Sequence, residues 1–169
     1  MSSPTLATSA LPDSGVYVVA LQLERPLGIA VGALGRLDFP AGTYWYVGSA
    51  KRGLPDRLAR HARAVKRLRW HIDYLTTLVP VTVAWVWRWE AGLECRIAAH
   101  VAEAAVVVPG FGSSDCRCKG HLFRCRENGD WLFPTVGQFP EPVVSVLPGP
   151  QSDLHTVSVT AFHGEPIEQ

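Results

Sequence analysis

The chain has 169 residues, of which 47% are hydrophobic, and this length suits one globular domain with an ordinary core rather than two. Its longest apolar stretch, residues 78–87, is too short to span a bilayer, and residues 1–14 have neither the basic start nor the apolar segment of an export signal. A net charge of +1 excludes a strongly charged chain, and four cysteines without an export signal argue against a disulfide framework. We therefore expect a cytoplasmic protein without membrane contact, whose cysteines are reduced thiols or metal ligands.

The first third of the chain predicts a flexible arm followed by strands. Residues 1–13 are rich in Ser, Pro, Thr and Ala, which is typical of a mobile segment. Residues 16–23 are rich in Val, Leu and Tyr and are bounded by Gly15 and Pro26, which predicts a well-buried first strand. Residues 28–35 and 44–47 are predicted to be further strands, separated by a turn near residues 40–42. The core is thus expected to begin as a β-hairpin or meander.

A helix is predicted over residues 54–67. Its apolar residues recur at spacings of four, four and three: Leu54, Leu58, Ala62 and Val65. Pro55 suits the first turn of such a helix. Arg57 and His61 would stand one turn apart beside the apolar stripe, at the edge of the core.

The remaining elements complete the expected fold. Residues 70–78 are predicted to form a second helix, 81–89 a strand and 93–106 a third helix with Glu94 in its first turn. From residue 134 onward, prolines and glycines separate short Val-rich runs, which is compatible with an extended tail that adds an edge strand. We expect one α/β domain over residues 14–133, with a small mixed or antiparallel central sheet flanked by helices, and an acidic Pro/Gly-rich extension over 134–169.

Half of the sixteen Lys and Arg residues lie between residues 51 and 69, where the only acid is Asp56: Lys51, Arg52, Arg57, Arg60, Arg63, Lys66, Arg67 and Arg69. After Arg126 the chain has six acids and no Lys or Arg, so a basic field coexists with near neutrality. A run of this kind also fits a solvated helix face. Its overlap with Arg57 and His61 favours a surface that binds the phosphates of a nucleic acid.

Several short segments carry a recognisable pattern. Gly15-Val16-Tyr17 and Tyr46-Val47-Gly48-Ser49-Ala50 precede Arg57 and His61, and Glu94 follows. A tyrosine, an arginine, a histidine and a carboxylate are the groups that one-metal cleavage of a phosphodiester requires. The same order continues with residues 70–75 (WHIDYL) and 111–118 (FGSSDCRC).

Over residues 14–125 this pattern resembles the GIY-YIG nuclease superfamily and, within it, the DUF123 branch of small prokaryotic proteins. The resemblance implies that Tyr17 acts near the attacking water, that Arg57 binds the scissile phosphate and that Glu94 holds Mg²⁺ or Mn²⁺. It also implies that Tyr46 shapes the same site and that His61 accepts a proton from Tyr17 or from the water. We accordingly expect an endonuclease that acts on DNA, with DNA repair as its setting.

Each of these residues also fits a structural role. The two tyrosines fit half-buried strand aromatics, and Glu94 fits a favourable first-turn carboxylate. Many GIY-YIG nucleases carry a late asparagine, whereas the single asparagine here, Asn128, lies outside the matching part. Its role is absent or is taken by Ser114 or Asp115. His71 is expected at the rim of the site, and Asp73 is expected to fix an arginine or His61.

A Cys/His cluster follows at residues 116–125. Its thiols and imidazole are suitable Zn²⁺ ligands at short spacing: Cys116, Cys118, His121 and Cys125. Cys95, on the third helix, is most simply a core residue. The alternative is that these groups are buried thiols or line the cleft without a metal.

Two other functions remain open beside the nuclease. The first is a non-catalytic nucleic-acid-binding module with the same fold and the same basic segment. The second is a zinc-stabilised interaction domain whose cysteine segment and acidic tail bind a protein partner that the sequence does not identify.

Overall fold

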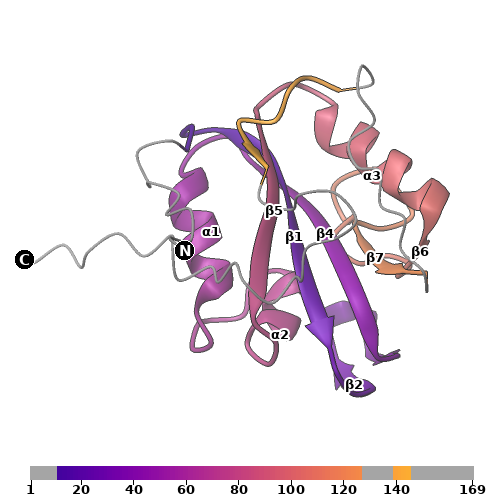
Figure 1. Ribbon diagram of the computed structural model, residues 1–169. Helices are drawn as coiled ribbons and strands as arrows, with labels where there is room; N and C mark the ends of the chain where they lie inside the picture. Colours follow the sequence, from indigo (N-terminus) through magenta and orange to yellow (C-terminus); the bar gives the residue numbers. More distant parts are fainter. Residues whose placement is uncertain (1–10, 127–138, 146–169) are drawn as a thin grey trace, which may run out of the picture.

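The computed structural model describes residues 11–126 and 139–145 (Figure 1). The main sheet has six strands in the order β6-β7-β4-β1-β5-β8, and every pair is antiparallel. Its strands are β1 (Gly15–Leu23), β4 (Gly42–Ala50), β5 (Val81–Arg88), β6 (Ala105–Val107), β7 (Leu122–Cys125) and β8 (Val144–Ser145). The predicted α/β fold with a central antiparallel sheet is confirmed.

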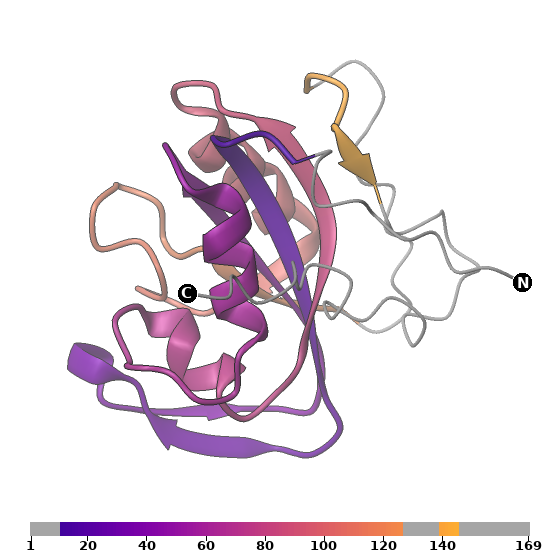
Figure 2. The same ribbon diagram turned by 90° about the vertical axis from the view of Figure 1, so that its left-hand side faces the viewer.

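Helices cover both faces of this sheet, as the two views in Figures 1 and 2 show. On one face lie α1 (Leu54–Ala62) and α2 (His71–Thr76), and on the other lies α3 (Leu93–Ala104). Each face has its own apolar core, the first containing Leu58 and Leu75 and the second containing Ile97 and Val101. The domain is therefore a three-layer structure with the sheet in the middle.

Strand β1 lies between β4 and β5 and is buried on both faces. Tyr17, Val19 and Leu21 face the core under α1 and α2, and Val16 and Val18 face the core under α3. A strand with two buried faces needs no polar alternation, which explains its continuous apolar sequence. The predicted well-buried first strand is confirmed.

The strand predicted over residues 28–35 ends at Ala30 in the structure. The chain forms a separate hairpin of β2 (Leu27–Ala30) and β3 (Arg36–Phe39), joined by the short 3-10 helix η2 (Gly32–Leu34). Gly32 and Gly35 have φ values of 47° and 71°, a backbone region that reverses the chain and that favours glycine. The glycines therefore end a strand that the apolar pattern alone would continue.

Helix α1 ends at Ala62 rather than at residue 67. Arg63 has extended backbone angles, and the side chain of Val65, expected in the core, is 90% exposed. The Lys66 ammonium donates hydrogen bonds to the carbonyl oxygens of Arg60 and His61 in the last turn. The Arg60 carbonyl also accepts from the backbone amide of Arg63, so Lys66 adds a second donor to the last carbonyls of the helix, where the chain leaves it.

The other predicted elements are present, with small changes at their ends. Strand β8, in the C-terminal extension, pairs with Trp85 and Val86 of β5, as expected for an edge strand. The predictions for residues 1–10, 127–138 and 146–169, which include most of the N-terminal arm, most of the extension and Asn128, lie outside the described residues. Within the described ranges, no helix is both long and apolar enough to cross a membrane.

Candidate functional site

A cavity of about 300 Å³ opens where β1, β4, α1 and α3 meet the connection before α2 and the loop between β6 and β7. All five predicted catalytic side chains line it: Tyr17, Tyr46, Arg57, His61 and Glu94. Ser114 and Asp115, the two candidates for the missing asparagine, line it as well. A larger hollow of about 840 Å³, between the β1–β2 turn and the α2–β5 connection, contains none of these groups.

Two glycines allow the tyrosines to lie in this cavity. Tyr17 pairs with Gly48 across β1 and β4, and a Cβ atom at Gly48 would lie 2.5 Å from both Cζ and Oη of Tyr17. A Cβ atom at Gly112 would lie 2.9 Å from the Tyr46 ring, and Gly112 also has a φ of +71°. Any larger residue at either position would displace a tyrosine.

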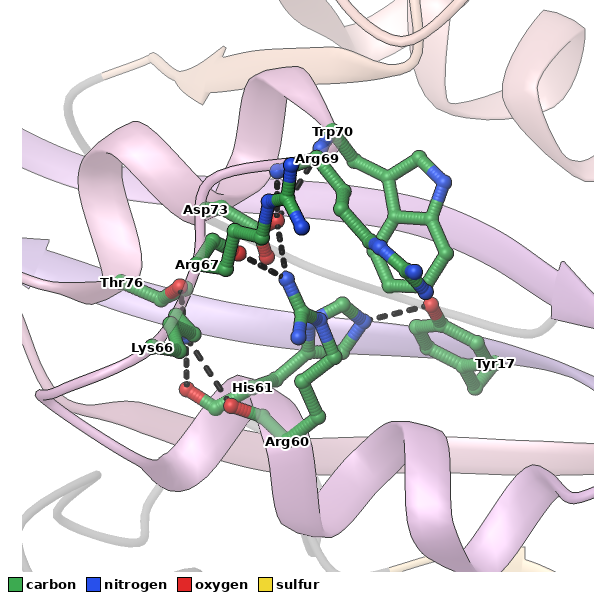
Figure 3. A network of polar contacts seen from close by, with 9 residues as sticks. All are labelled: Tyr17, Arg60, His61, Lys66, Arg67, Arg69, Trp70, Asp73 and Thr76. Carbon is green, nitrogen blue, oxygen red and sulfur yellow. Dashed lines mark hydrogen bonds and ion pairs between the residues drawn. The ribbon is translucent and has the colours of Figure 1, made fainter.

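Tyr17 and His61 form a buried pair (Figure 3). The Tyr17 hydroxyl lies 2.6 Å from Nε2 of His61, and both residues are 1% exposed. Burial raises the pKa of the Tyr17 phenol well above its ordinary value and lowers the pKa of His61 to about 3. Both groups are therefore neutral at pH 7. The hydrogen bond between them is donated either by the hydroxyl or by the N–H of the imidazole.

Arg57 is held at the edge of the cavity by two contacts. Its guanidinium carbon lies 4.5 Å from the centre of the Trp70 ring, and its Nη1 donates to the backbone carbonyl of Ser49. The Trp70 ring and the Ser49 carbonyl together hold the guanidinium in the cavity lining, where it can meet an anion.

Glu94 occupies the first turn of α3, and its side chain is 30% exposed. One carboxylate oxygen accepts a hydrogen bond from the Ser49 hydroxyl, and the other lies 3.1 Å from Nδ1 of His121. Burial raises the pKa of Glu94, but the His121 and Ser49 hydrogen bonds outweigh this effect and hold it below its ordinary value. Glu94 is thus a carboxylate with free lone pairs, a donor that fits Mg²⁺ if water and phosphate complete the shell.

His71, expected at the rim, connects α2 to the β6–β7 loop. The backbone amide of Gly112 donates to its Nδ1 at 2.9 Å, so the ring proton is on Nε2 when the imidazole is neutral. This contact fixes the loop that carries Ser114 and Asp115 beside the cavity.

The predicted basic surface divides into two groups. Arg60 forms an ion pair of 2.8 Å with the buried Asp73, as expected for that carboxylate, and Lys66 also donates to Thr76 (Figure 3). Burial lowers the pKa of Lys66 to about 8. These two cations are used within the fold. Arg69 lines the cavity, and the other predicted cations lie at the surface: Lys51, Arg52, Arg63 and Arg67.

The cysteines are grouped differently from the sequence prediction. None of the four forms a disulfide. The candidate metal cluster consists of Cys95, Cys116, Cys118 and His121, whose ligand atoms lie within 4.8 Å of one another, and Cys125 is not part of it. Cys125 lies on β7 opposite Ala105, where burial raises its pKa to about 12. Only the packing of α3 against the β6–β7 loop brings Cys95 to the cluster, so sequence spacing could not indicate it.

Comparison with protein families gave one match. The family described as domain of unknown function DUF123 matches residues 16–136. The chain belongs to DUF123. The DUF123 match includes every residue that lines the cavity and all four members of the Cys/His cluster. No curated protein and no solved structure matches the chain.

Proposed function

We propose that this DUF123 protein is a divalent-metal-dependent endonuclease of the GIY-YIG type, which hydrolyses phosphodiester bonds in DNA. The observation that carries the proposal is the meeting of five side chains from β1, β4, α1 and α3 around one cavity: Tyr17, Tyr46, Arg57, His61 and Glu94. A neutral proton-transfer pair, a cation and a carboxylate are the groups that hydrolysis of a phosphodiester needs.

The charges around the cavity support a polyanionic substrate. Arg57 and Arg69 line the cavity itself, and Lys51, Arg52, Arg63 and Arg67 are exposed on the same segment of the chain. A cavity of about 300 Å³ suits a phosphate and its sugar better than a stretch of bases. We infer that the protein selects DNA by structure, as a repair nuclease does, rather than by reading a long sequence.

The chemistry follows from the positions of these groups. A divalent ion held by Glu94 would supply a Lewis acid for the phosphate and lower the pKa of a coordinated water. Arg57 binds a non-bridging oxygen of the scissile phosphate and neutralises the charge that develops there. The stacking of Arg57 on Trp70 fixes this cation before the substrate arrives.

Tyr17 and His61 move the proton of the attacking water. In this mechanism we assign the shared proton to the Tyr17 hydroxyl, which donates to Nε2 of His61 and keeps lone pairs on its oxygen to accept a hydrogen bond from water in the cavity. As the water oxygen bonds to phosphorus, its proton passes to Tyr17 while the Tyr17 proton passes to His61. As the bond between phosphorus and the leaving oxygen breaks, that oxygen takes a proton from a water molecule. Because burial depresses the pKa of His61, the imidazolium then gives its proton back through Tyr17 to the solvent, which restores the pair.

A cleavage assay tests the proposal. Labelled single-stranded, duplex, flap and junction DNA are incubated with the protein and Mg²⁺ or Mn²⁺, beside an EDTA control and two variants. Glu94→Gln should abolish cleavage but retain DNA binding, because it removes the carboxylate charge and keeps the side chain's shape. Glu103→Gln, at an exposed position on the same helix, is the matched control and should cleave at the wild-type rate.

Two results would contradict parts of the proposal. Cleavage by Glu94→Gln at the wild-type rate would remove the metal assignment. Salt-sensitive binding of all four DNA forms without cleavage of any would instead indicate the non-catalytic binding module.

A further inference from the structure

The Cys/His cluster combines donors from two parts of the chain. Cys95 lies in the first turn of α3, Cys116 and Cys118 lie in the β6–β7 loop, and His121 directly precedes β7. Tetrahedral zinc with thiolate ligands at about 2.3 Å places neighbouring ligand atoms about 3.8 Å apart. The cluster has its ligand atoms within 4.8 Å of one another, and Sγ of Cys116 lies 3.4 Å from Nε2 of His121. The four donors are thus close to the arrangement that one zinc ion requires.

His121 has the ring tautomer that ligates a metal through Nε2. Its Nδ1 lies 3.2 Å from the Val47 carbonyl oxygen and 3.1 Å from a Glu94 carboxylate oxygen. Both partners are acceptors only, so Nδ1 carries the proton and donates it. In the neutral ring Nε2 then has a lone pair, and it faces Cys116. The side chain of His121 is 2% exposed, so water does not compete for either nitrogen.

We propose that Cys95, Cys116, Cys118 and His121 bind one structural zinc ion, and that His121, through Nδ1, positions the Glu94 carboxylate in the cavity. A zinc-bound imidazole commonly donates its second N–H to a carboxylate, which orients both groups. On binding, the three thiols release three protons, and the ion with three thiolates has one negative charge. The exposed cations Arg117 and Lys119 lie in the same loop.

Metal content tests the site without any assumption about catalysis. The full-length protein, purified without chelator, should contain one zinc per chain by elemental analysis. Replacement of zinc by Co²⁺ should give the intense visible bands of tetrahedral cobalt together with a thiolate charge-transfer band. Titration of the wild-type thiols with a mercurial reagent should release the zinc in step with their modification, and this measurement needs no variant.

The chain offers a matched pair of cysteine variants. Cys95→Ser should lose stoichiometric zinc, because it removes a ligand. Cys125→Ser should keep one zinc per chain, because Cys125 lies outside the cluster. Wild-type protein that holds neither zinc nor cobalt after reconstitution, or that holds iron instead, would overturn the zinc site. Loss of zinc from Cys125→Ser but not from Cys95→Ser would overturn this ligand set.

The coupling to Glu94 rests on the proposed nuclease and has its own test. His121→Cys offers zinc a fourth thiolate but removes the N–H that holds Glu94. It should keep one zinc per chain, cleave about 10- to 100-fold more slowly and need more Mg²⁺ for half-maximal rate. Unchanged cleavage and Mg²⁺ dependence in a zinc-loaded His121→Cys would overturn the coupling alone. Absence of cleavage by the wild type with one zinc bound would overturn the proposed function and leave the zinc site standing.

Discussion

The Tyr17 hydroxyl and the His61 imidazole are neutral groups in a buried pair, joined by a hydrogen bond of 2.6 Å. In a dry site such a pair holds a proton in place without the cost of a buried charge. In the proposed reaction the Tyr17 oxygen also accepts the proton of the attacking water. The pair therefore connects β1 and α1 to the proposed proton transfer.

Removal of the Tyr17 hydroxyl should separate catalysis from stability. Tyr17→Phe keeps the ring against Gly48 and loses one hydrogen bond, so the free energy of unfolding should fall by about 1 kcal/mol. Single-turnover cleavage should slow by about 10²- to 10⁴-fold, the usual contribution of a positioned proton-transfer group. Tyr44→Phe is the control, because its hydroxyl donates to the Pro40 carbonyl outside the cavity. Equal cleavage rates for the two variants would remove Tyr17 from the mechanism.

His61 should make the fold sensitive to acid. Burial holds its folded-state pKa at about 3, below the value of 6.5 expected in the unfolded chain. The unfolded state therefore binds more protons between these values, and the free energy of unfolding should fall as the pH decreases from about 6.5 towards 3. Compared with His61→Gln, the wild type should lose up to about 1.4 kcal/mol more per pH unit in this window. Urea unfolding at several pH values measures the difference, and parallel profiles would contradict it.

At the scale of elements, the connection between α1 and α2 depends on one buried carboxylate. Oδ2 of Asp73 accepts hydrogen bonds from Arg60 and from the backbone amides of Arg69 and Trp70. Burial raises the pKa of Asp73, but these bonds outweigh that effect and hold it below its ordinary value. Because Trp70 stacks on Arg57, Asp73 also helps to place the guanidinium that we propose binds phosphate.

Substitution of this carboxylate should therefore affect both stability and substrate binding. Asp73→Asn leaves Arg60 without its charge partner and should lower the free energy of unfolding by about 3 kcal/mol, measured by urea titration. It should also raise the KM for DNA cleavage, since Trp70 is less firmly placed. Asp56→Asn, at an exposed position in the first turn of α1, is the control and should change both by little. A stability change in Asp73→Asn no larger than in the control would contradict this role.

At the scale of the whole molecule, the proposed DNA-binding surface predicts a measurable salt dependence. Each phosphate contact contributes about 0.9 to the slope of log affinity against log salt concentration. Arg63→Ala with Arg67→Ala should therefore reduce this slope by about 2 and weaken binding of all DNA sequences alike. The pair Arg25→Ala with Arg36→Ala removes two exposed cations near the β2–β3 hairpin and should leave the slope unchanged. Fluorescence anisotropy at several salt concentrations gives both slopes, and equal slopes would place the DNA elsewhere.

The sequence predicted most of the sheet and the helices, because each of those elements has its own local pattern. The run of apolar residues in β1 and the spacing of Leu54 and Leu58 in α1 both report burial directly. The end of α1 could not be predicted in this way. Val65 continues the helical spacing, but Lys66 and Asp73 draw the chain away through contacts that the spacing does not encode.

In the candidate site, too, sequence patterns predicted some features and tertiary contacts decided the others. The motif residues from Tyr17 to Glu94 were identified from the order of short segments, and they do line one cavity. The cysteine cluster was only partly identified, because Cys95 is distant in sequence from Cys116 and reaches it through the packing of α3. Likewise, two of the predicted DNA-binding cations, Arg60 and Lys66, are used inside the fold by Asp73 and Thr76 of α2.

The sequence by itself determined most of the elements that form, which chemical groups are available and that the chain belongs to DUF123, since these depend on local patterns and on segment order. Only the tertiary structure decided which groups meet. Strand register places Tyr17 over Gly48, and helix packing places Glu94 beside His121. These contacts join residues 31 and 27 positions apart, and their geometry depends on how whole elements pair and pack, which no local pattern specifies.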